Sequence, residues 1–195
     1  MPPHKTDNSH LEAKVALRLE ALRQLGRDSV HVVDAFAGTG LVWAEVRART
    51  DVDVQTLSID RKPYAGASVI SADNRKVLGG LDYRGFDLVD LDAYGVPHEQ
   101  LRLVAKAAPA LPVLVTCILG NMSIPPGRVL DAAGIPEAWR RNAPQVLFAR
   151  WKLEFWSAYA ASLGYTHTLR YVFRDPNLVK VYELLTRTPT AQEAS

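Results

Sequence analysis

The stretch from Val30 to Gly40 constrains the fold more than any other part of the chain. Its first half is a short, mostly apolar run of β-branched residues, which is typical of a buried strand. The run ends in a carboxylate, Asp34, and passes into a turn that contains Gly38 and Gly40. A helix is expected directly afterwards, over Leu41 to Arg49. A strand, a tight glycine turn and a helix in this order open a nucleotide-binding βαβ fold.

The glycines and the acid of this turn restrict its ligand. Gly38 and Gly40 lack a Cβ, so the backbone can take up positive φ and a cofactor can approach the helix closely. The spacing is Asp-x-Phe-x-Gly-x-Gly from Asp34 to Gly40, not the Gly-x-Gly-x-x-Gly of dinucleotide sites. A carboxylate here favours a cationic ligand and repels a pyrophosphate. The loop alone is also compatible with an ordinary strand-to-helix turn.

The rest of the chain alternates strands and helices. Helices are expected at residues 9–26, 41–49, 75–81, 98–108, 137–142 and 145–163, and strands at residues 30–34, 52–60, 67–71, 86–92, 113–119, 165–173 and 178–185. Ser9 and Glu12 would form a capping box at the start of the first helix. The last two strands alternate like a hairpin. This pattern predicts the α/β class, with a single Rossmann-like, doubly wound sheet of seven strands that ends in a C-terminal antiparallel hairpin.

Length and composition agree with one domain. We assign residues 10–187 to it, residues 1–9 to a flexible N-terminus and residues 188–195 to a polar tail. A net charge of +2 and 48% hydrophobic residues describe an ordinary protein, so bulk charge does not announce nucleic-acid binding. Cys117 is the only cysteine and the histidines lack ligand spacing, so no metal site is expected. No apolar run reaches membrane-spanning length, and a cytoplasmic location is expected.

Acidic residues close each of the next strands. Asp60 follows Gly40 by about twenty residues, the distance at which α/β nucleotide sites place an acid against ribose hydroxyls. Asp73 comes just after the third strand. Asp90 and Asp92 end the fourth strand and point to the same face, where burial is costly unless they have a use. The alternative is that these acids are solvated at strand ends or cap their own loops.

The motif Asp34-x-Phe36-x-Gly38-x-Gly40 resembles the first motif of class I S-adenosylmethionine-dependent methyltransferases, and residues 30–187 follow the strand plan of that family. The resemblance implies the class I methyltransferase fold, with S-adenosylmethionine as cofactor. Its amino-acid end would lie beside the glycine turn, its ribose at Asp60 and its adenine near Asp73 and Asn74. The cofactor-binding residues that we expect are Asp34, Phe36, Gly38, Gly40, Asp60, Asp73, Asn74 and Asp90, the last one supporting the site through loop amides.

The segment from Asp90 to Pro97, Asp-Leu-Asp-Ala-Tyr-Gly-Val-Pro, resembles the Asp-Leu-Asp-Pro-Phe-Gly-x-Pro segment of tRNA guanine-N2 dimethyltransferases. It is more distantly similar to the Asp/Asn-Pro-Pro-Tyr segment of amino-methylating nucleic-acid enzymes. The resemblance implies that Asp92 holds the target amine and that Tyr94 stacks on the base, which makes them the catalytic candidates. Ala93 replaces a proline and is expected to loosen the backbone there. A core position for Tyr94 is the alternative.

We therefore predict a methyltransferase that acts on an exocyclic amino nitrogen of a nucleobase, in tRNA or another nucleic acid. A methyltransferase for a protein or small molecule, and a non-catalytic module with the cofactor fold, are the alternatives. The chain leaves little room for the added RNA-binding domain of the tRNA family, which favours the first alternative or a platform supplied by a partner. Residues 120–144, long and rich in proline, would form a mobile cover over the substrate side.

Two short runs interleave aromatic and basic residues, as a nucleic-acid surface does: Trp139-Arg140-Arg141 and Arg150-Trp151-Lys152. However, Trp151, Phe155 and Tyr159 recur at helical spacing, which favours a place in the core.

Overall fold

The computed structural model describes residues 10–64, 68–120, 127–142, 150–175 and 178–187. In chain order the helices and strands are α1 (Leu11–Leu25), β1 (Ser29–Asp34), α2 (Leu41–Arg47), β2 (Asp53–Asp60), β3 (Ile70–Ser71), α3 (Asn74–Gly80), β4 (Leu88–Asp92), α4 (His98–Ala107), β5 (Val113–Gly120), α5 (Gly127–Ala132), α6 (Glu137–Asn142), α8 (Lys152–Ser162), β6 (Tyr165–Asp175) and β7 (Leu178–Arg187).

The strands form one sheet in the order β3-β2-β1-β4-β5-β7-β6. Strands β1 to β5 pair in parallel, and β7 runs antiparallel to both β5 and β6. The chain order reverses between β1 and β4, which is where open α/β sheets bind their ligands. The predicted fold class is confirmed, including the closing hairpin.

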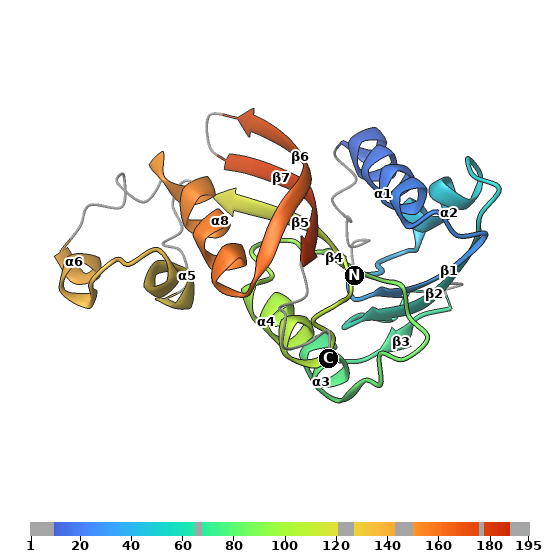
Figure 1. The fold of residues 1–195 in the computed structure, drawn as a ribbon, viewed down its shortest axis with the longest axis horizontal. Helices are drawn as coiled ribbons and strands as arrows, with labels where there is room; N and C mark the ends of the chain where they lie inside the picture. Colours follow the sequence, from blue (N-terminus) through green and yellow to red (C-terminus); the bar gives the residue numbers. More distant parts are fainter. Residues whose placement is uncertain (1–9, 65–67, 121–126, 143–149, 176–177, 188–195) are drawn as a thin grey trace.

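Helices cover both faces of the sheet, so the central strands are apolar on both sides (Figure 1). Helices α1 and α2 cover one face, where the core includes Val15, Leu17, Val32, Trp43, Leu88, Leu114, Tyr182 and Leu184. Helices α3, α4 and α8 cover the other, where the core includes Val33, Leu91, Leu101, Val115, Cys117, Trp156 and Val181. Helix α5 packs against α8.

The strand register places acidic side chains at the carboxyl edge of the sheet. Asp34 of β1 pairs with Asp90 of β4, and Asp92 pairs with Thr116 of β5. Paired residues on neighbouring strands point to the same face, and residues two apart on a strand do so too. The three carboxylates therefore face α1 and α2.

The N-terminus of α1 differs from its prediction. Ser9 lies outside the described residues, and His10, which precedes the helix with φ 58°, makes no side-chain cap hydrogen bond. Glu12, the other half of the expected capping box, instead accepts hydrogen bonds from Arg49 at 2.6 and 3.0 Å. This carboxylate thus forms a charge-assisted pair with an arginine.

The segment expected as a mobile cover carries two short helices, α5 and α6, in its described part. Helix α6 has the predicted bounds, whereas α5 was not expected. Of the predicted helix over 145–163, the structure describes the part from Arg150 onward. Helix α8, Lys152–Ser162, lies in this part. No helix within the described ranges is long and apolar enough to cross a membrane.

Candidate active site

A cavity of about 620 Å³ opens where β1, β4 and β5 end. Residues from six parts of the chain line it: Lys14, Phe36, Ala37, Gly38, Thr39, Leu41, Val42, Asp60, Arg61, Lys62, Tyr64, Asp92, Ala93, Tyr94, Thr116, Ile118 and Tyr182. A second cavity of about 380 Å³ shares Phe36, Asp60 and Arg61 with it and continues to Asp73 and Asn74. These volumes lie in the range of small-molecule sites, and the shared walls make the two cavities neighbours.

The glycine turn and the acid of β2 form one unit. Gly38 and Gly40 have φ of 55° and 77°, the left-handed region in which a side chain is strained. Asp60 accepts a hydrogen bond from the Gly38 amide at 3.0 Å and another from the Lys62 amide at 2.9 Å. Each carboxylate oxygen has a second lone pair. Asp60 can therefore fix the turn and still accept hydrogen bonds from a ligand.

The side chains expected at the adenine end line the smaller cavity and are held in place by other residues. Asp73 caps α3 through the Arg75 amide at 3.0 Å, and its hydrogen bonds to the Arg75 side chain hold the pKa of this carboxyl down to about 2. The side-chain amide of Asn74 donates through Nδ2 to the Ala35 carbonyl at 2.8 Å, and its Oδ1 accepts from Gln100 Nε2 at 3.1 Å. These contacts tie α3 to β1 and α4, so the cavity wall is preorganised.

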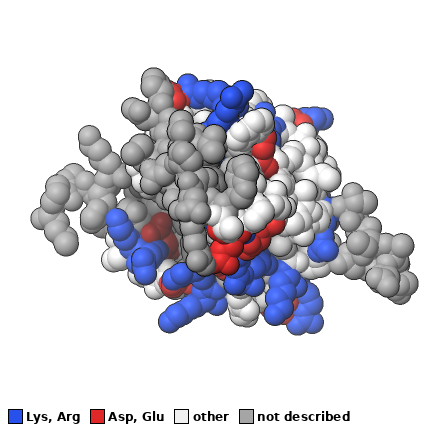
Figure 2. Space-filling model, turned by 90° about the vertical axis from the view of Figure 1, so that its left-hand side faces the viewer, with Lys and Arg blue, Asp and Glu red and all other residues white. Residues whose placement is uncertain are grey.

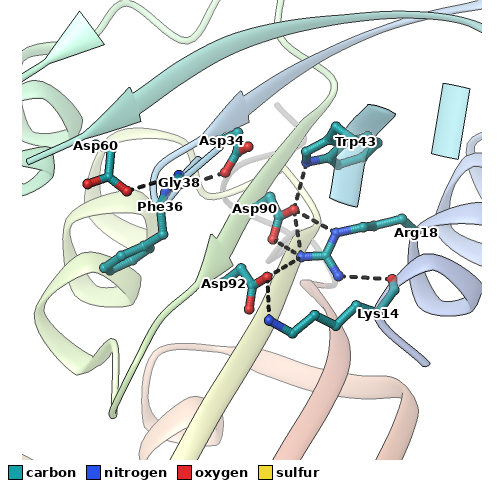
Figure 3. A network of polar contacts seen from close by, with 9 residues as sticks. All are labelled: Lys14, Arg18, Asp34, Phe36, Gly38, Trp43, Asp60, Asp90 and Asp92. Atoms are coloured by element: carbon teal, nitrogen blue, oxygen red, sulfur yellow. Dashed lines mark hydrogen bonds and ion pairs between the residues drawn. The ribbon is translucent and has the colours of Figure 1, made fainter. Parts of the chain in front are cut away.

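Asp90 lies behind the larger cavity and is fully buried. Its two oxygens accept hydrogen bonds from Arg18 Nε and Nη2, both at 2.8 Å, and Trp43 Nε1 donates to the same carboxylate at 2.8 Å (Figure 3). Arg18 is 1% exposed and also donates to the Lys14 carbonyl. The sequence predicts loop amides as the partners of Asp90. Instead, the guanidinium of Arg18 on α1 donates to both oxygens of this carboxylate. Asp90 lines neither cavity.

Asp92 lies two residues beyond Asp90, at the end of β4, and lines the larger cavity. Its Oδ2 accepts from Lys14 Nζ at 2.9 Å and lies 3.5 Å from Arg18 Nη2. Its Oδ1 is buried and has no hydrogen-bond partner within the described part of the chain. One oxygen of this carboxylate is thus held by the protein, while the other has an unused acceptor site.

Asp34 is the third acid of this group. It is buried, and its Oδ1 lies 3.4 Å from the Phe36 amide, which donates to it. Burial and the neighbouring charge of Asp90 raise the pKa of Asp34 well above its ordinary value. Asp34 lines neither cavity. Asp34, Asp90 and Asp92 outnumber the two cations that they face, so a further positive charge nearby would favour the ionised form of Asp34.

The loop after β4 is fixed to β5. The Ala93 amide donates to the Leu91 carbonyl at 2.9 Å and to the Thr116 carbonyl at 3.2 Å, and the Ile118 amide donates to Gly95 at 2.9 Å. A proline at position 93 would lack this N–H. The expectation that Ala93 loosens the loop is therefore wrong. Tyr94, next in the chain, is 85% exposed rather than a core residue.

Sequence reasoning missed Lys14, Arg18, Trp43 and Thr116. The signal for the two cations was present, because they are four residues apart and share a helix face with Val15 and Leu22. A charged residue on an apolar stripe points to a buried partner.

In the two basic-aromatic runs, the described side chains line neither cavity: Arg140, Arg150, Trp151 and Lys152. Trp151 is 47% exposed and lies under the Arg150 guanidinium, 5.5 Å from it, whereas Tyr159 is in the core as expected. The core interpretation is thus wrong for Trp151. The side chains of Trp139 and Arg141 lie outside the described residues. Across the described ranges, no cluster of histidine, cysteine, aspartate or glutamate could hold a metal ion, and Cys117 is buried.

The sequence matches no protein-family model, and no curated protein is significantly similar to it. Its fold is similar to those of solved methyltransferases. Trm1 from Pyrococcus horikoshii, solved with S-adenosyl-L-methionine, has a TM-score of 0.53 and 15% identity over 94% of this chain, which spans only 56% of that chain. The 1,6-didemethyltoxoflavin-N1-methyltransferase of Burkholderia thailandensis, solved with 1,6-didemethyltoxoflavin and S-adenosylhomocysteine, has a TM-score of 0.52 and 16% identity over 93% of this chain and 80% of that chain.

The Mtq2-Trm112 complex of E. cuniculi, responsible for methylation of the eRF1 translation termination factor, has a TM-score of 0.56 and 13% identity over 96% of this chain and 100% of that chain. These likenesses show that the fold is that of class I methyltransferases, as the sequence motif predicted.

Proposed function

We propose that this chain is an S-adenosylmethionine-dependent methyltransferase that acts on an exocyclic amino nitrogen of a nucleobase. The observation that carries the proposal is Asp92 in the larger cavity. Its Oδ2 is held by Lys14, its buried Oδ1 has no partner among the described residues, and the exposed ring of Tyr94 follows two residues later. An acceptor beside an exposed aromatic ring suits a flat molecule that carries an N–H donor.

The surrounding residues fit the cofactor. The glycine turn allows close approach of a ligand, Asp60 has lone pairs for two ribose hydroxyls, and the second cavity beside Asn74 has room for the adenine. The surplus of carboxylates over cations on the α1 side suits the positive ammonium and sulfonium groups. When bound, the cofactor supplies an electrophilic methyl group.

The chemistry asks little of the protein beyond position and charge. The lone pair of an exocyclic nitrogen is delocalised into its ring, so the nitrogen is a poor nucleophile. Asp92 Oδ1 would accept an N–H bond from it, orient the lone pair towards the methyl carbon and stabilise the positive charge that develops. As the N–C bond forms, the C–S bond breaks and its electron pair stays on sulfur. The nitrogen then releases its proton to solvent.

Basic side chains at the cavity support a nucleic acid as the substrate. Arg61 and Lys62 are exposed at the wall of the larger cavity, where they can contact phosphates beside a bound base. The end that carries α5, α6 and α8 shows basic side chains at its upper and lower edges with acidic ones between them (Figure 2).

A carboxamide nitrogen of a protein is the second candidate. The E. cuniculi complex methylates a translation factor, and that chain is matched over its whole length. A primary amide presents the same planar N–H donor as a nucleobase amine, so Asp92 could hold either.

The test is single-turnover methyl transfer to bulk tRNA, to single-stranded DNA and to a glutamine-containing peptide. We expect Asp92→Ala to slow transfer by about 10²- to 10³-fold, because it removes an interaction made mainly in the transition state. Cofactor affinity, measured by calorimetry, should fall much less than the rate, because Asp34 and Asp90 remain in the cluster. Tyr94→Ala should weaken substrate binding by about 1–3 kcal/mol if a base stacks on the ring, and Tyr94→Phe should be mild.

Asp82→Ala is the matched control, because Asp82 is an exposed acid that pairs with Arg84 far from the cavity. Transfer by Asp92→Ala at the wild-type rate would show that this carboxylate does not hold the target. Transfer to the peptide alone would favour the carboxamide substrate.

A further inference from the structure

Thr116 combines burial with an unused hydroxyl. Within the described part of the chain, four buried side-chain polar atoms have no hydrogen-bond partner: Asp92 Oδ1, Thr116 Oγ1, Lys152 Nζ and Tyr165 OH. Of these, only the atoms of Asp92 and Thr116 belong to residues that line the larger cavity. Thr116 is 2% exposed, so water does not readily satisfy its hydroxyl. Native proteins seldom leave such a group without a partner unless a ligand uses it.

The strand register places the two residues side by side. Asp92 and Thr116 are register partners on the parallel strands β4 and β5, which lie about 4.8 Å apart, and they point to the same face. The Thr116 carbonyl accepts from the Ala93 amide, which fixes its backbone. A β-branched side chain also has few rotamers to choose from. The hydroxyl is therefore held at the cavity wall by its surroundings.

The two groups have complementary hydrogen-bonding capacities. Asp92 Oδ1 can only accept when the carboxylate is ionised, whereas the Thr116 hydroxyl can donate. A ligand that satisfies both atoms offers a donor and an acceptor next to each other. In adenine, cytosine and guanine an exocyclic amine and a ring nitrogen with a free lone pair are bonded to the same carbon, which gives this arrangement.

We propose that Thr116 is a specificity-determining residue whose hydroxyl donates to the ring nitrogen beside the target amine while Asp92 accepts from the amine itself. This inference rests on the proposed function and names a second residue that would recognise the group bearing the target amine. The pair selects a planar amine with an acceptor on the same carbon. It rejects alkyl amines such as a lysine side chain, which leave the hydroxyl unpaired.

The experiment pairs a variant with an altered base. Thr116→Val keeps the shape of the side chain and removes the hydroxyl. Single-turnover transfer is measured on oligonucleotides that contain adenine, cytosine or guanine, and on matched ones in which the ring nitrogen is replaced by C–H: 1-deazaadenine, 3-deazacytosine and 3-deazaguanine. On the natural base, Thr116→Val should be slower by about tenfold, and the deaza base should slow the wild type by a similar factor. On the deaza base, Thr116→Val should lose nothing further, because the bond is already absent.

Two readouts separate this role from a structural one. Thr116→Val should unfold at a higher temperature than the wild type, because it removes an unpaired buried hydroxyl, and should keep the wild-type cofactor affinity. Thr116→Ser should restore most of the rate. Thr168→Val is the control, because that hydroxyl bonds Thr186 at 2.7 Å on the hairpin, away from the cavity.

The outcomes are distinguishable. If the wild type methylates a base and Thr116→Val does so at the same rate, or loses as much on the deaza base as on the natural one, the assignment of Thr116 is wrong and the proposed function stands. If the wild type methylates none of the oligonucleotides, both are wrong.

Discussion

The sheet carries two buried acidic centres on opposite faces, and they are built differently. The first, the aspartate cluster, consists of Asp34, Asp90 and Asp92 with Arg18 and Lys14 of α1. The second is the Glu183 centre, under α8. Glu183 is 0% exposed and accepts hydrogen bonds from Arg170 at 2.8 Å and from Trp156, with His167 at 3.0 Å.

The difference lies in what remains unsatisfied. Neither oxygen of Glu183 is without a partner in the described structure, and Glu183 lines neither of the two cavities at the sheet edge. The aspartate cluster has more acids than cations, one carboxylate oxygen without a partner and a cavity in front of it. A buried acid is therefore not by itself a sign of chemistry. Surplus charge and unused lone pairs beside a cavity are the better sign.

The largest effect should follow the loss of Arg18. Arg18→Met leaves Asp90 buried without its bidentate partner, so the free energy of unfolding should fall by about 3–5 kcal/mol. Urea unfolding at neutral pH measures this. The double variant Arg18→Met, Asp90→Asn should recover most of the loss, because no buried charge remains and Trp43 can still donate to the amide oxygen. Equal stability of Arg18→Met and the wild type would show that Asp90 is not paired in solution.

The matching change in the other centre should cost less. Arg170→Met removes one charged hydrogen bond from Glu183, but Trp156 and His167 remain, so we expect a loss of about 1–3 kcal/mol. The fold survives, and the rate of methyl transfer should equal that of the wild type because Glu183 lies on the opposite face. A selective loss of transfer by a folded Arg170→Met would break the comparison between the two centres.

The smallest effect concerns protons at Asp34. Burial and Asp90 raise the pKa of Asp34 above its ordinary value of 3.8, so this group contributes stability at low pH that is lost as pH rises through the raised pKa. A cationic ligand favours the carboxylate and should release up to one proton on binding. S-adenosylmethionine should therefore bind more tightly as pH rises through that pKa.

Calorimetry in two buffers with different ionisation enthalpies counts the released protons. Asp34→Asn is the control, since it keeps an oxygen for the Phe36 amide but carries no titratable group. Asp34→Asn should release fewer protons than the wild type on binding. At a pH above the raised pKa of Asp34, the variant should also unfold at a higher temperature than the wild type. Equal proton release by the variant and the wild type would separate Asp34 from cofactor binding.

The sequence predicted the sheet well because burial on both faces leaves a direct pattern. Apolar runs such as Val113 to Leu119 and the alternating hairpin strands can be recognised without knowing their neighbours. The capping box at Ser9 and Glu12 is a local motif too, but Arg49, in the turn after α2, binds the same carboxylate. Local patterns fail where a distant residue supplies the stronger partner.

The candidate site divides in the same way. Gly38, Asp60 and Asn74 line the cavities at the edge that the strand order implied, although their contact with a cofactor stays a prediction. Arg18 was missed because its partner is 72 residues away, so its place on the apolar face of the helix does not identify the carboxylate that it meets. Nothing distinguishes Thr116 in the sequence, since only the fold shows that its hydroxyl is unpaired beside Asp92. Mobility of residues 120–144 also stays a prediction.

The ion pairs of α1 have a consequence for the order of folding. Lys14 and Arg18 are synthesised early. The partner of Arg18, Asp90, follows 72 residues later, and the partner of Lys14, Asp92, follows 78 residues later. Until β4 has paired with β1, the helix has two cations on its apolar face and nowhere to bury them. We therefore expect helix α1 to dock after β4 has joined β1 at the centre of the sheet. The wall of the cavity is completed only at that step, so a nascent chain that has not reached β4 cannot bind a ligand there.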